Sequence, residues 1–106
     1  MNRPGAVSPG MTKDDLSTPA LIIDLDLMES NICRMSEYVK AAGLKLRPHG
    51  KSHKCPEIAR LQARAGAVGV CAATIREAEA LAAAGIGGLL ITAEMVGRDK
   101  IARLVR

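Results

Sequence analysis

The chain has 106 residues, of which 48% are hydrophobic, and its formal net charge is +4. This length supports one small domain, and so small a positive excess, with Tyr38 as the single aromatic residue, argues against a nucleic-acid partner that would be bound by base stacking. No segment is apolar for long enough to predict a membrane-spanning helix or a signal peptide, so we expect a cytoplasmic protein without a membrane partner.

The N-terminal third predicts a lead-in, a strand and a helix. Residues 1–18 contain two prolines and two glycines, which predicts a flexible lead-in. The apolar run at 19–25 predicts a strand, and Asp26 with Glu29 has the spacing of a helix start. Gly43 is expected to end this helix. Its apolar face, which we expect to pack in the core, consists of Met28, Ile32, Met35, Val39 and Ala42.

A strand followed by a helix then recurs along the rest of the chain. The expected strands are 44–48, 67–71 and 89–92, and the expected helices are 56–65, 75–84 and 99–105. Glycines are expected to end the first two of these helices, and Thr74 with Glu77 forms a capping box at the start of the second. The alternation is typical of βαβ crossovers, so we expect an α/β fold whose parallel strands lie in chain order.

Three parallel strands leave two open edges, which is unusual for a complete domain. The last expected helix also reaches the end of the chain at Arg106 without a stop signal. We therefore expect the chain to be the N-terminal part of a longer protein. Helices on one outer side of the strands would indicate a barrel, whereas helices on both faces would indicate a doubly wound sheet.

The segment 47–54, which reads RPHGKSHK, concentrates one arginine, two lysines and both histidines in eight residues. It follows a predicted strand, and α/β proteins place their chemistry at that end of a strand. A lysine there can contact a phosphate, act as a base or attack a carbonyl group. If the backbone stays extended, its alternate residues, from Arg47 to His53, point to one side. Thr92 and Glu94 follow the third strand at the same expected edge and are candidate cofactor or substrate contacts.

Two longer segments carry a resemblance to a known family. Residues 17–26 (STPALIIDLD) and 46–59 (LRPHGKSHKCPEIA) resemble the N-terminus of the D-threonine aldolase family. The match continues through 69–71 (GVC), 77–79 (EAE) and 96–97 (VG). That family stands with D-serine dehydratase and 3-hydroxy-D-aspartate aldolase, and its members bind pyridoxal 5′-phosphate (PLP) on an alanine-racemase-like fold.

The resemblance implies a fold for residues 19–106. They would form the truncated N-terminal part of a (β/α)8 TIM-type barrel, with about three βα units preceded by a strand and a helix. The strand at 19–25 would lie apart from the barrel and pair with a C-terminal β-domain. The full-length protein is expected to be a monomer or a homodimer.

The resemblance also implies a reaction and the residues that carry it. Lys51, the lysine of R-P-H-x-K, would form the Schiff base with PLP, and His49 and Arg47 would contact the cofactor. Further candidate contacts are His53, Thr92 and Glu94. The substrate would be a small D-3-hydroxy amino acid, cleaved to glycine and an aldehyde, or alternatively dehydrated as by D-serine dehydratase or cleaved as by 3-hydroxy-D-aspartate aldolase. A divalent metal (Mn, Mg or Zn) would be held by ligands outside this chain, so we expect the isolated 106 residues to be inactive.

Other interpretations of the same segment remain. His49, His53 and Cys55 invite a zinc site, but a complete ligand set would need Cys33 or Cys71, which lie far away in the sequence, so we expect no metal site here. The cysteines show no CxxC spacing and fit reduced cytosolic thiols. A PLP-binding protein without catalysis, or a small anion-binding module, would also use basic residues of this kind.

Overall fold

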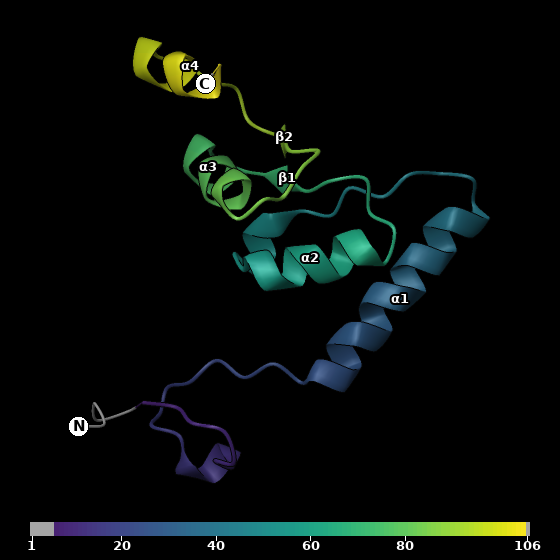
Figure 1. The fold of residues 1–106 in the computed structure, drawn as a ribbon, viewed down its shortest axis with the longest axis vertical. Helices are drawn as coiled ribbons and strands as arrows, with labels where there is room; N and C mark the ends of the chain where they lie inside the picture. Colours follow the sequence, from purple (N-terminus) through teal and green to yellow (C-terminus); the bar gives the residue numbers. More distant parts are fainter. Residues whose placement is uncertain (1–5, 106) are drawn as a thin grey trace.

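The computed structural model describes residues 6–105 and shows an α/β chain (Figure 1). In chain order its elements are η1 (Lys13–Asp15), α1 (Leu25–Ala41), η2 (Gly50–Ser52), α2 (Pro56–Arg64), β1 (Cys71–Ala72), α3 (Ile75–Ala83), β2 (Leu90–Ile91) and α4 (Arg98–Leu104). The three helices predicted after residue 55 are thus confirmed to within one residue at each end.

The strands are parallel and lie in the expected order, but they are short. Cys71 of β1 pairs with Leu90 of β2, and His49 forms an isolated parallel bridge to Cys71. The first predicted strand, 44–48, is therefore an extended segment beside β1 rather than a regular strand. Its carbonyl groups still accept hydrogen bonds, from Val68 N to Leu46 O (2.9 Å) and from Cys71 N to Pro48 O (2.8 Å). Pro48 has no N–H to return, which limits the ladder.

Helices α1, α2 and α3 each end at a glycine with a positive φ, as predicted: Gly43, Gly66 and Gly85. At the end of α3, Gly85 N donates to Ala82 O (2.9 Å) and Ile86 N donates to Leu81 O (3.0 Å). This pair of bonds is the Schellman motif, and it satisfies carbonyl groups that the helix leaves open. Each helix is therefore turned back by the residue that the sequence pattern indicates.

The buried core lies on one face of the short sheet. Val70 and Ala72 are fully buried, and residues two apart in an extended chain share a face. The same cluster holds Ala59 of α2 and two residues of α3, Ala78 and Leu81. Helices α2 and α3 therefore cover the same face of β1. Since most of these side chains are small, the apolar area that they bury is modest.

The N-terminal third consists of an unpaired segment followed by a helix that starts earlier than predicted. Residues 19–24 pair with no other described segment and form no strand here, which agrees with their lying apart from the sheet; pairing with a C-terminal β-domain stays a prediction, and Leu25 belongs to α1. The helix begins earlier than expected because Asp24, not Asp26, is its N-cap: Asp24 Oδ1 accepts from Leu27 N at 3.0 Å. That bond satisfies an amide that the helix cannot satisfy itself.

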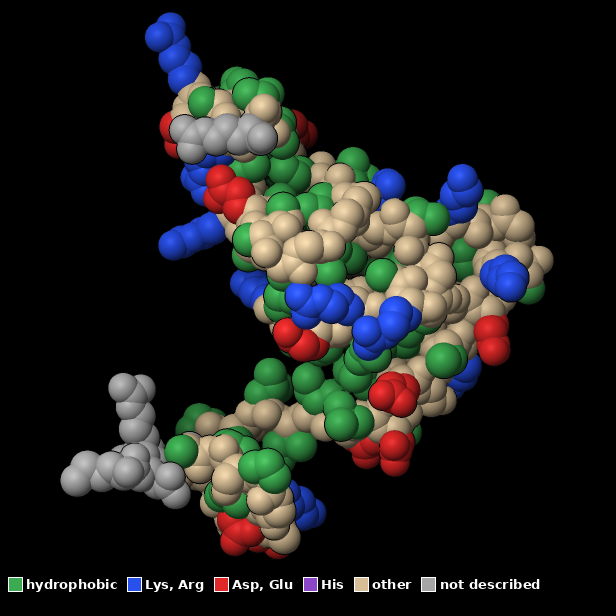
Figure 2. Space-filling view, in the orientation of Figure 1, with side chains coloured by type: hydrophobic (Ala, Val, Ile, Leu, Met, Phe, Trp, Pro, Cys, Tyr) green, Lys and Arg blue, Asp and Glu red, His purple; other side chains and the backbone are tan. Residues whose placement is uncertain are grey.

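The apolar face of α1 is not packed in the core. None of the helix residues is buried, and Met35 is 52% exposed. Hydrophobic side chains are also exposed on the segment before the helix, where Leu21 is 94% exposed (Figure 2). The radius of gyration is 17.0 Å, above the roughly 13 Å of a compact domain of this length. The described chain is therefore much more open than a single compact domain.

Short local elements lie near both ends of the described chain. In the predicted lead-in, residues 1–5 lie outside the described part, and η1 forms a short turn in which Asp15 Oδ2 accepts from Thr12 N at 2.7 Å. Helix α4 ends at Leu104, followed by the C-cap Val105. Arg106 lies outside the described residues. No helix in the described part is both long and apolar enough to cross a membrane.

Candidate active site

The basic segment turns sharply after His49. Residues Gly50–Ser52 form the 3-10 turn η2, and Ser52 Oγ donates to His49 O at 3.1 Å. Gly50 is buried, and a Cβ on it would lie 3.0 Å from Val70 Cγ1, so a larger residue would require the Val70 side chain to shift. The turn interrupts the extended backbone, and the alternate residues 47, 49, 51 and 53 therefore do not all point to one side.

His49 and Thr92 are brought together from segments 43 residues apart, with His49 Nε2 lying 3.0 Å from Thr92 Oγ1. His49 bridges to Cys71, which pairs with Leu90, so these three residues face the side opposite the core. Thr92 is two residues beyond Leu90 and shares that side. The structure thus places two of the predicted site residues in contact on the face that α2 and α3 do not cover.

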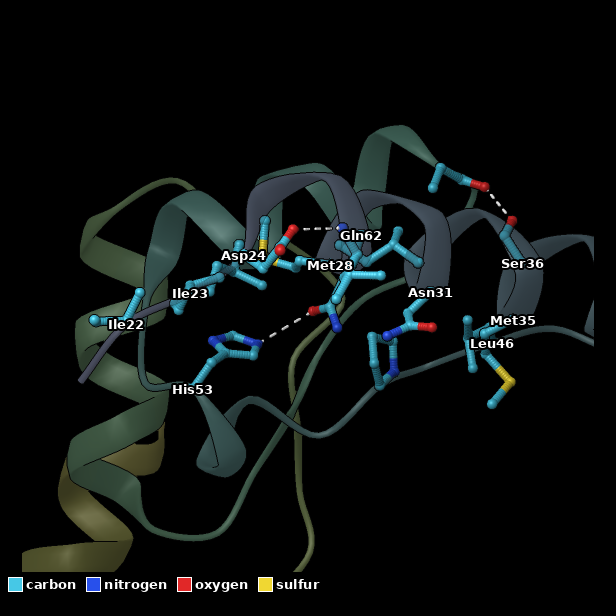
Figure 3. Close-up of a pocket in the computed structure, with 15 residues that line it drawn as sticks. Ile22, Ile23, Asp24, Met28, Asn31, Met35, Ser36, Leu46, His53 and Gln62 are labelled. Atoms are coloured by element: carbon cyan, nitrogen blue, oxygen red, sulfur yellow. Dashed lines mark hydrogen bonds between the residues drawn. The ribbon is translucent and has the colours of Figure 1, made fainter. Parts of the chain in front are cut away.

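His53 points elsewhere. Its Nδ1 accepts from Cys55 N at 3.0 Å, and its Nε2 lies 3.2 Å from Gln62 Oε1 of α2. The ring lines a groove of about 530 Å³ between α1 and α2 (Figure 3). The two imidazole rings therefore have different partners and do not converge on one metal ion. Within residues 6–105 no three side chains of His, Cys, Asp or Glu gather as a metal site would require.

The structure distinguishes the two lysines of the loop. Lys54 Nζ lies 3.9 Å from Glu77 Oε1, and Lys54 adopts a positive φ of 50°. Such a backbone is uncommon for a residue other than glycine and often marks a functional loop. Lys51 is exposed in η2, and its amine has no hydrogen-bond or ion-pair partner among the described residues. Of the two lysines, Lys51 is therefore the one whose amine is unpaired among the described residues.

Arg47 and Glu94 have exposed side chains that make no hydrogen bond or ion pair within residues 6–105. The carbonyl group of Arg47 accepts from Cys71 Sγ at 3.5 Å, which ties this backbone to β1. Arg47 thus offers an exposed cation beside the loop, and Glu94 offers an exposed carboxylate after β2. Both stay candidate contacts on the basis of position alone.

Glu77 is the neighbour of the site that the sequence analysis missed. Thr74 Oγ1 accepts from Glu77 N at 3.2 Å, which confirms the predicted cap of α3. The Glu77 carboxylate does not return to Thr74, however, because it accepts from Ala73 N at 2.8 Å and faces Lys54. It therefore joins the loop after the first extended segment to the loop after β1. The signal was present, since a carboxylate in the first turn of α3 lies at the sheet edge that carries the basic loop.

The comparisons with known proteins fix the family. Residues 23–106 match the family described as alanine racemase, N-terminal domain. The chain belongs to this family. The resemblance to the D-threonine aldolase family, identified from the sequence, is confirmed. The 3-hydroxy-D-aspartate aldolase of Paracoccus denitrificans (strain Pd 1222) is 46% identical to this chain over 99 residues, which cover 92% of this chain and 26% of that protein.

Solved structures of the family superpose closely on the chain. The crystal structure of D-threonine aldolase from Filomicrobium marinum gives a TM-score of 0.85 at 50% identity, over 87% of this chain and 25% of that one. D-threo-3-hydroxyaspartate dehydratase from Delftia sp. HT23 gives 0.80 at 40% identity, over 86% and 24%. A mutant of that dehydratase has been solved in a metal-free form. The chain spans about a quarter of the length of these relatives.

Proposed function

We propose that this chain is part of a PLP-dependent lyase of the D-threonine aldolase type. The enzyme would cleave the Cα–Cβ bond of a D-3-hydroxy amino acid and release glycine and an aldehyde. The observation that carries the proposal is the placement of Lys51, exposed and without a carboxylate partner, at the sheet edge where His49 and Thr92 meet. The likeness to aldolases over most of the chain supports the same reaction class.

The residues on this face suit PLP. The Lys51 amine would attach the cofactor covalently through its aldehyde, the His49 ring stands beside the Lys51 backbone, and Arg47 adds a positive charge for an anionic group. When bound, PLP supplies an electron sink for the bond that breaks at Cα. Among the chain's own residues, His49 accepts from the backbone N–H of Lys51, and Glu77 is engaged by Lys54 and Ala73 N.

The fold supports this assignment. Helices α2 and α3 cover one face of parallel segments in chain order, as in the outer ring of a barrel, and His49 and Thr92 lie on the other face. We therefore propose that residues 19–106 belong to the truncated N-terminal part of a (β/α)8 barrel, in which a first segment and helix precede about three βα units. The substrate is a small D-amino acid, and a divalent metal near its β-hydroxyl would be held outside this chain. The metal-free form of the related dehydratase supports a metal in this enzyme class.

Covalent labelling tests the role of Lys51. The protein, expressed from its complete gene and loaded with PLP, is reduced with borohydride and mapped by mass spectrometry. We expect the pyridoxyl group on Lys51. The matched control is Lys54→Ala, which removes the partner of Glu77 and should leave the label in place. Label on Lys54 or Lys45 instead of Lys51 would overturn the assignment, and no label anywhere would favour a simple anion-binding loop.

Product analysis distinguishes an aldolase from a dehydratase. The similar solved structures include enzymes of both kinds. D-Threonine and 3-hydroxy-D-aspartate are supplied in turn with PLP and Mn²⁺. An aldolase yields glycine together with an aldehyde, whereas a dehydratase yields a 2-oxo acid and ammonia. Lys51→Arg should abolish either activity, because a guanidinium stays protonated and cannot attack the aldehyde of PLP. If PLP binds and no product forms, the result would indicate a PLP-binding protein without catalysis.

A further inference from the structure

Both ring nitrogens of His49 are engaged, and their partners fix the tautomer. The backbone N–H of Lys51 lies 3.3 Å from Nδ1 and can only donate, so Nδ1 is the acceptor. A neutral ring then carries its hydrogen on Nε2, which donates to Thr92 Oγ1 at 3.0 Å. A hydrogen on Nδ1 would point at the Lys51 N–H and would prevent this hydrogen bond. Between the two tautomers of the neutral ring, the arrangement therefore favours the Nε2–H form.

The Thr92 hydroxyl is itself oriented by the sheet. It donates to the carbonyl oxygen of Ala72 at 3.3 Å, and Thr92 N donates to the same oxygen at 2.9 Å. Because its hydrogen is used on Ala72, a lone pair of Oγ1 is left to accept from His49. A continuous series of hydrogen bonds thus runs from the amide of Lys51 through His49 and Thr92 to β1.

His53 has the same local hydrogen bond as His49, in which a backbone amide two residues ahead donates to Nδ1. For His53 the donor is the amide of Cys55. The Nε2 of His53 is directed to Gln62 on α2, away from Thr92. Each ring is therefore tethered by its own loop and aimed by a distant partner, and for His49 that partner comes from beyond β2.

We propose that Thr92 is a positioning residue for Lys51. By accepting from Nε2 of His49, it keeps Nδ1 available to the Lys51 amide and so holds the turn η2 in place. This proposal rests on the proposed function, in which Lys51 attaches PLP. It assigns Thr92 a different role from the direct cofactor or substrate contact expected from the sequence, because the hydroxyl is already committed on both sides.

Three variants of the protein expressed from its complete gene test this role. Thr92→Val replaces the hydroxyl by a methyl group of similar size, and Thr92→Ser retains the hydroxyl. The matched control Thr74→Val removes a threonine hydroxyl that caps α3 and does not touch His49. The first readout is the ¹⁵N chemical shift of the two His49 ring nitrogens in the cofactor-free protein. The second is the rate at which Lys51 acquires label after PLP and borohydride are added.

We expect the Nε2–H form of His49 in the wild type, in Thr92→Ser and in Thr74→Val. Thr92→Val should show a mixture of tautomers and label Lys51 about tenfold more slowly, since small misplacements of a reacting group have effects of that order or larger. An Nδ1–H ring in the wild type overturns the proposal without any variant. Equal labelling rates in the wild type and Thr92→Val overturn it while the proposed function stands, whereas absence of label on wild-type Lys51 overturns both.

Discussion

Helices α1 and α3 are alike at their ends and different along their faces. Each begins with a side chain that caps an amide, Asp24 for Leu27 N at 3.0 Å and Thr74 for Glu77 N at 3.2 Å. Each ends at a glycine with a positive φ. Yet α3 buries Ile75, Ala78 and Leu81, whereas α1 buries none of its 17 residues.

The difference shows that the limits of a helix and its burial have separate causes. Caps and glycine stops are satisfied within a few residues, so they need no neighbour. Burial needs an opposing surface, and α3 has one because it packs against both β1 and β2. The apolar face of α1 instead lines the open groove between α1 and α2. Ser36 Oγ of α1 donates a hydrogen bond to Ala65 O at the end of α2. Four sets of substitutions test this distinction between tertiary packing and local hydrogen bonds.

The largest effect is expected where the backbones of Gly69 and Gly88 lie in close contact. A Cβ on Gly69 would lie 1.9 Å from the carbonyl oxygen of Gly88, which is backbone and cannot move aside cheaply. We expect Gly69→Ala to lower the free energy of unfolding by about 3 kcal/mol or more. Urea denaturation of the protein measures this change.

Gly87→Ala is the matched control for that substitution. A Cβ on Gly87 meets no atom within 4 Å, and no positive φ is recorded there. The control should therefore stay within about 0.5 kcal/mol of the wild type. Equal stability of the two variants would show that the strands do not approach as closely as described.

The second test compares one apolar side chain from each helix. Leu81 of α3 is 6% exposed and Met35 of α1 is 52% exposed. Leu81→Ala should cost about 2 to 3 kcal/mol, because it leaves a cavity in the core. Met35→Ala should cost less than about 1 kcal/mol, since half of its surface already meets water. A cost at Met35 that matched the cost at Leu81 would mean that another part of the protein covers the face of α1.

The third test concerns the caps, where the two helices should behave alike. Asp24→Ala and Thr74→Ala each remove the side-chain oxygen that accepts from an amide in the first turn. We expect each to cost about 1 kcal/mol, measured by urea denaturation or by faster amide exchange at Leu27 and Glu77. Asp24→Asn and Thr74→Ser retain an acceptor and serve as controls. A cap effect confined to α3 would show that the start of α1 is held by tertiary contacts instead.

The smallest effect is expected in η1, which is entirely local. The backbone N–H and then the hydroxyl of Thr12 hydrogen-bond to the Asp15 carboxylate and lower its pKa below its ordinary value. Because the folded pKa is lowered, the contribution to stability is present above the ordinary pKa and is lost as pH falls through the folded value. Thr12→Val removes only the hydroxyl bond, so the pKa should rise part of the way back, whereas Thr12→Ser should keep it. Carboxyl ¹³C shifts of Asp15 during an acid titration measure both, and an unchanged titration in Thr12→Val would refute the hydroxyl's role.

The sequence by itself determined the parts of this protein that depend on near neighbours. Gly43, Gly66 and Gly85 end their helices through bonds that span at most a few residues, and Pro56–Arg64 and Ile75–Ala83 form where the start and stop signals indicate. The loop at 47–54 was identified by its composition, and its resemblance identified the family. Such features need no knowledge of what lies across the fold.

Only the tertiary structure decided which residues meet. The contact of His49 with Thr92 joins positions 43 residues apart, and it depends on the register of the extended segments. The same register sends His53 to Gln62 and leaves Lys51 free while Lys54 pairs with Glu77. The apolar pattern of α1 predicted a face but not its burial, because a periodic pattern states which side is apolar and only an opposing surface can remove that side from water.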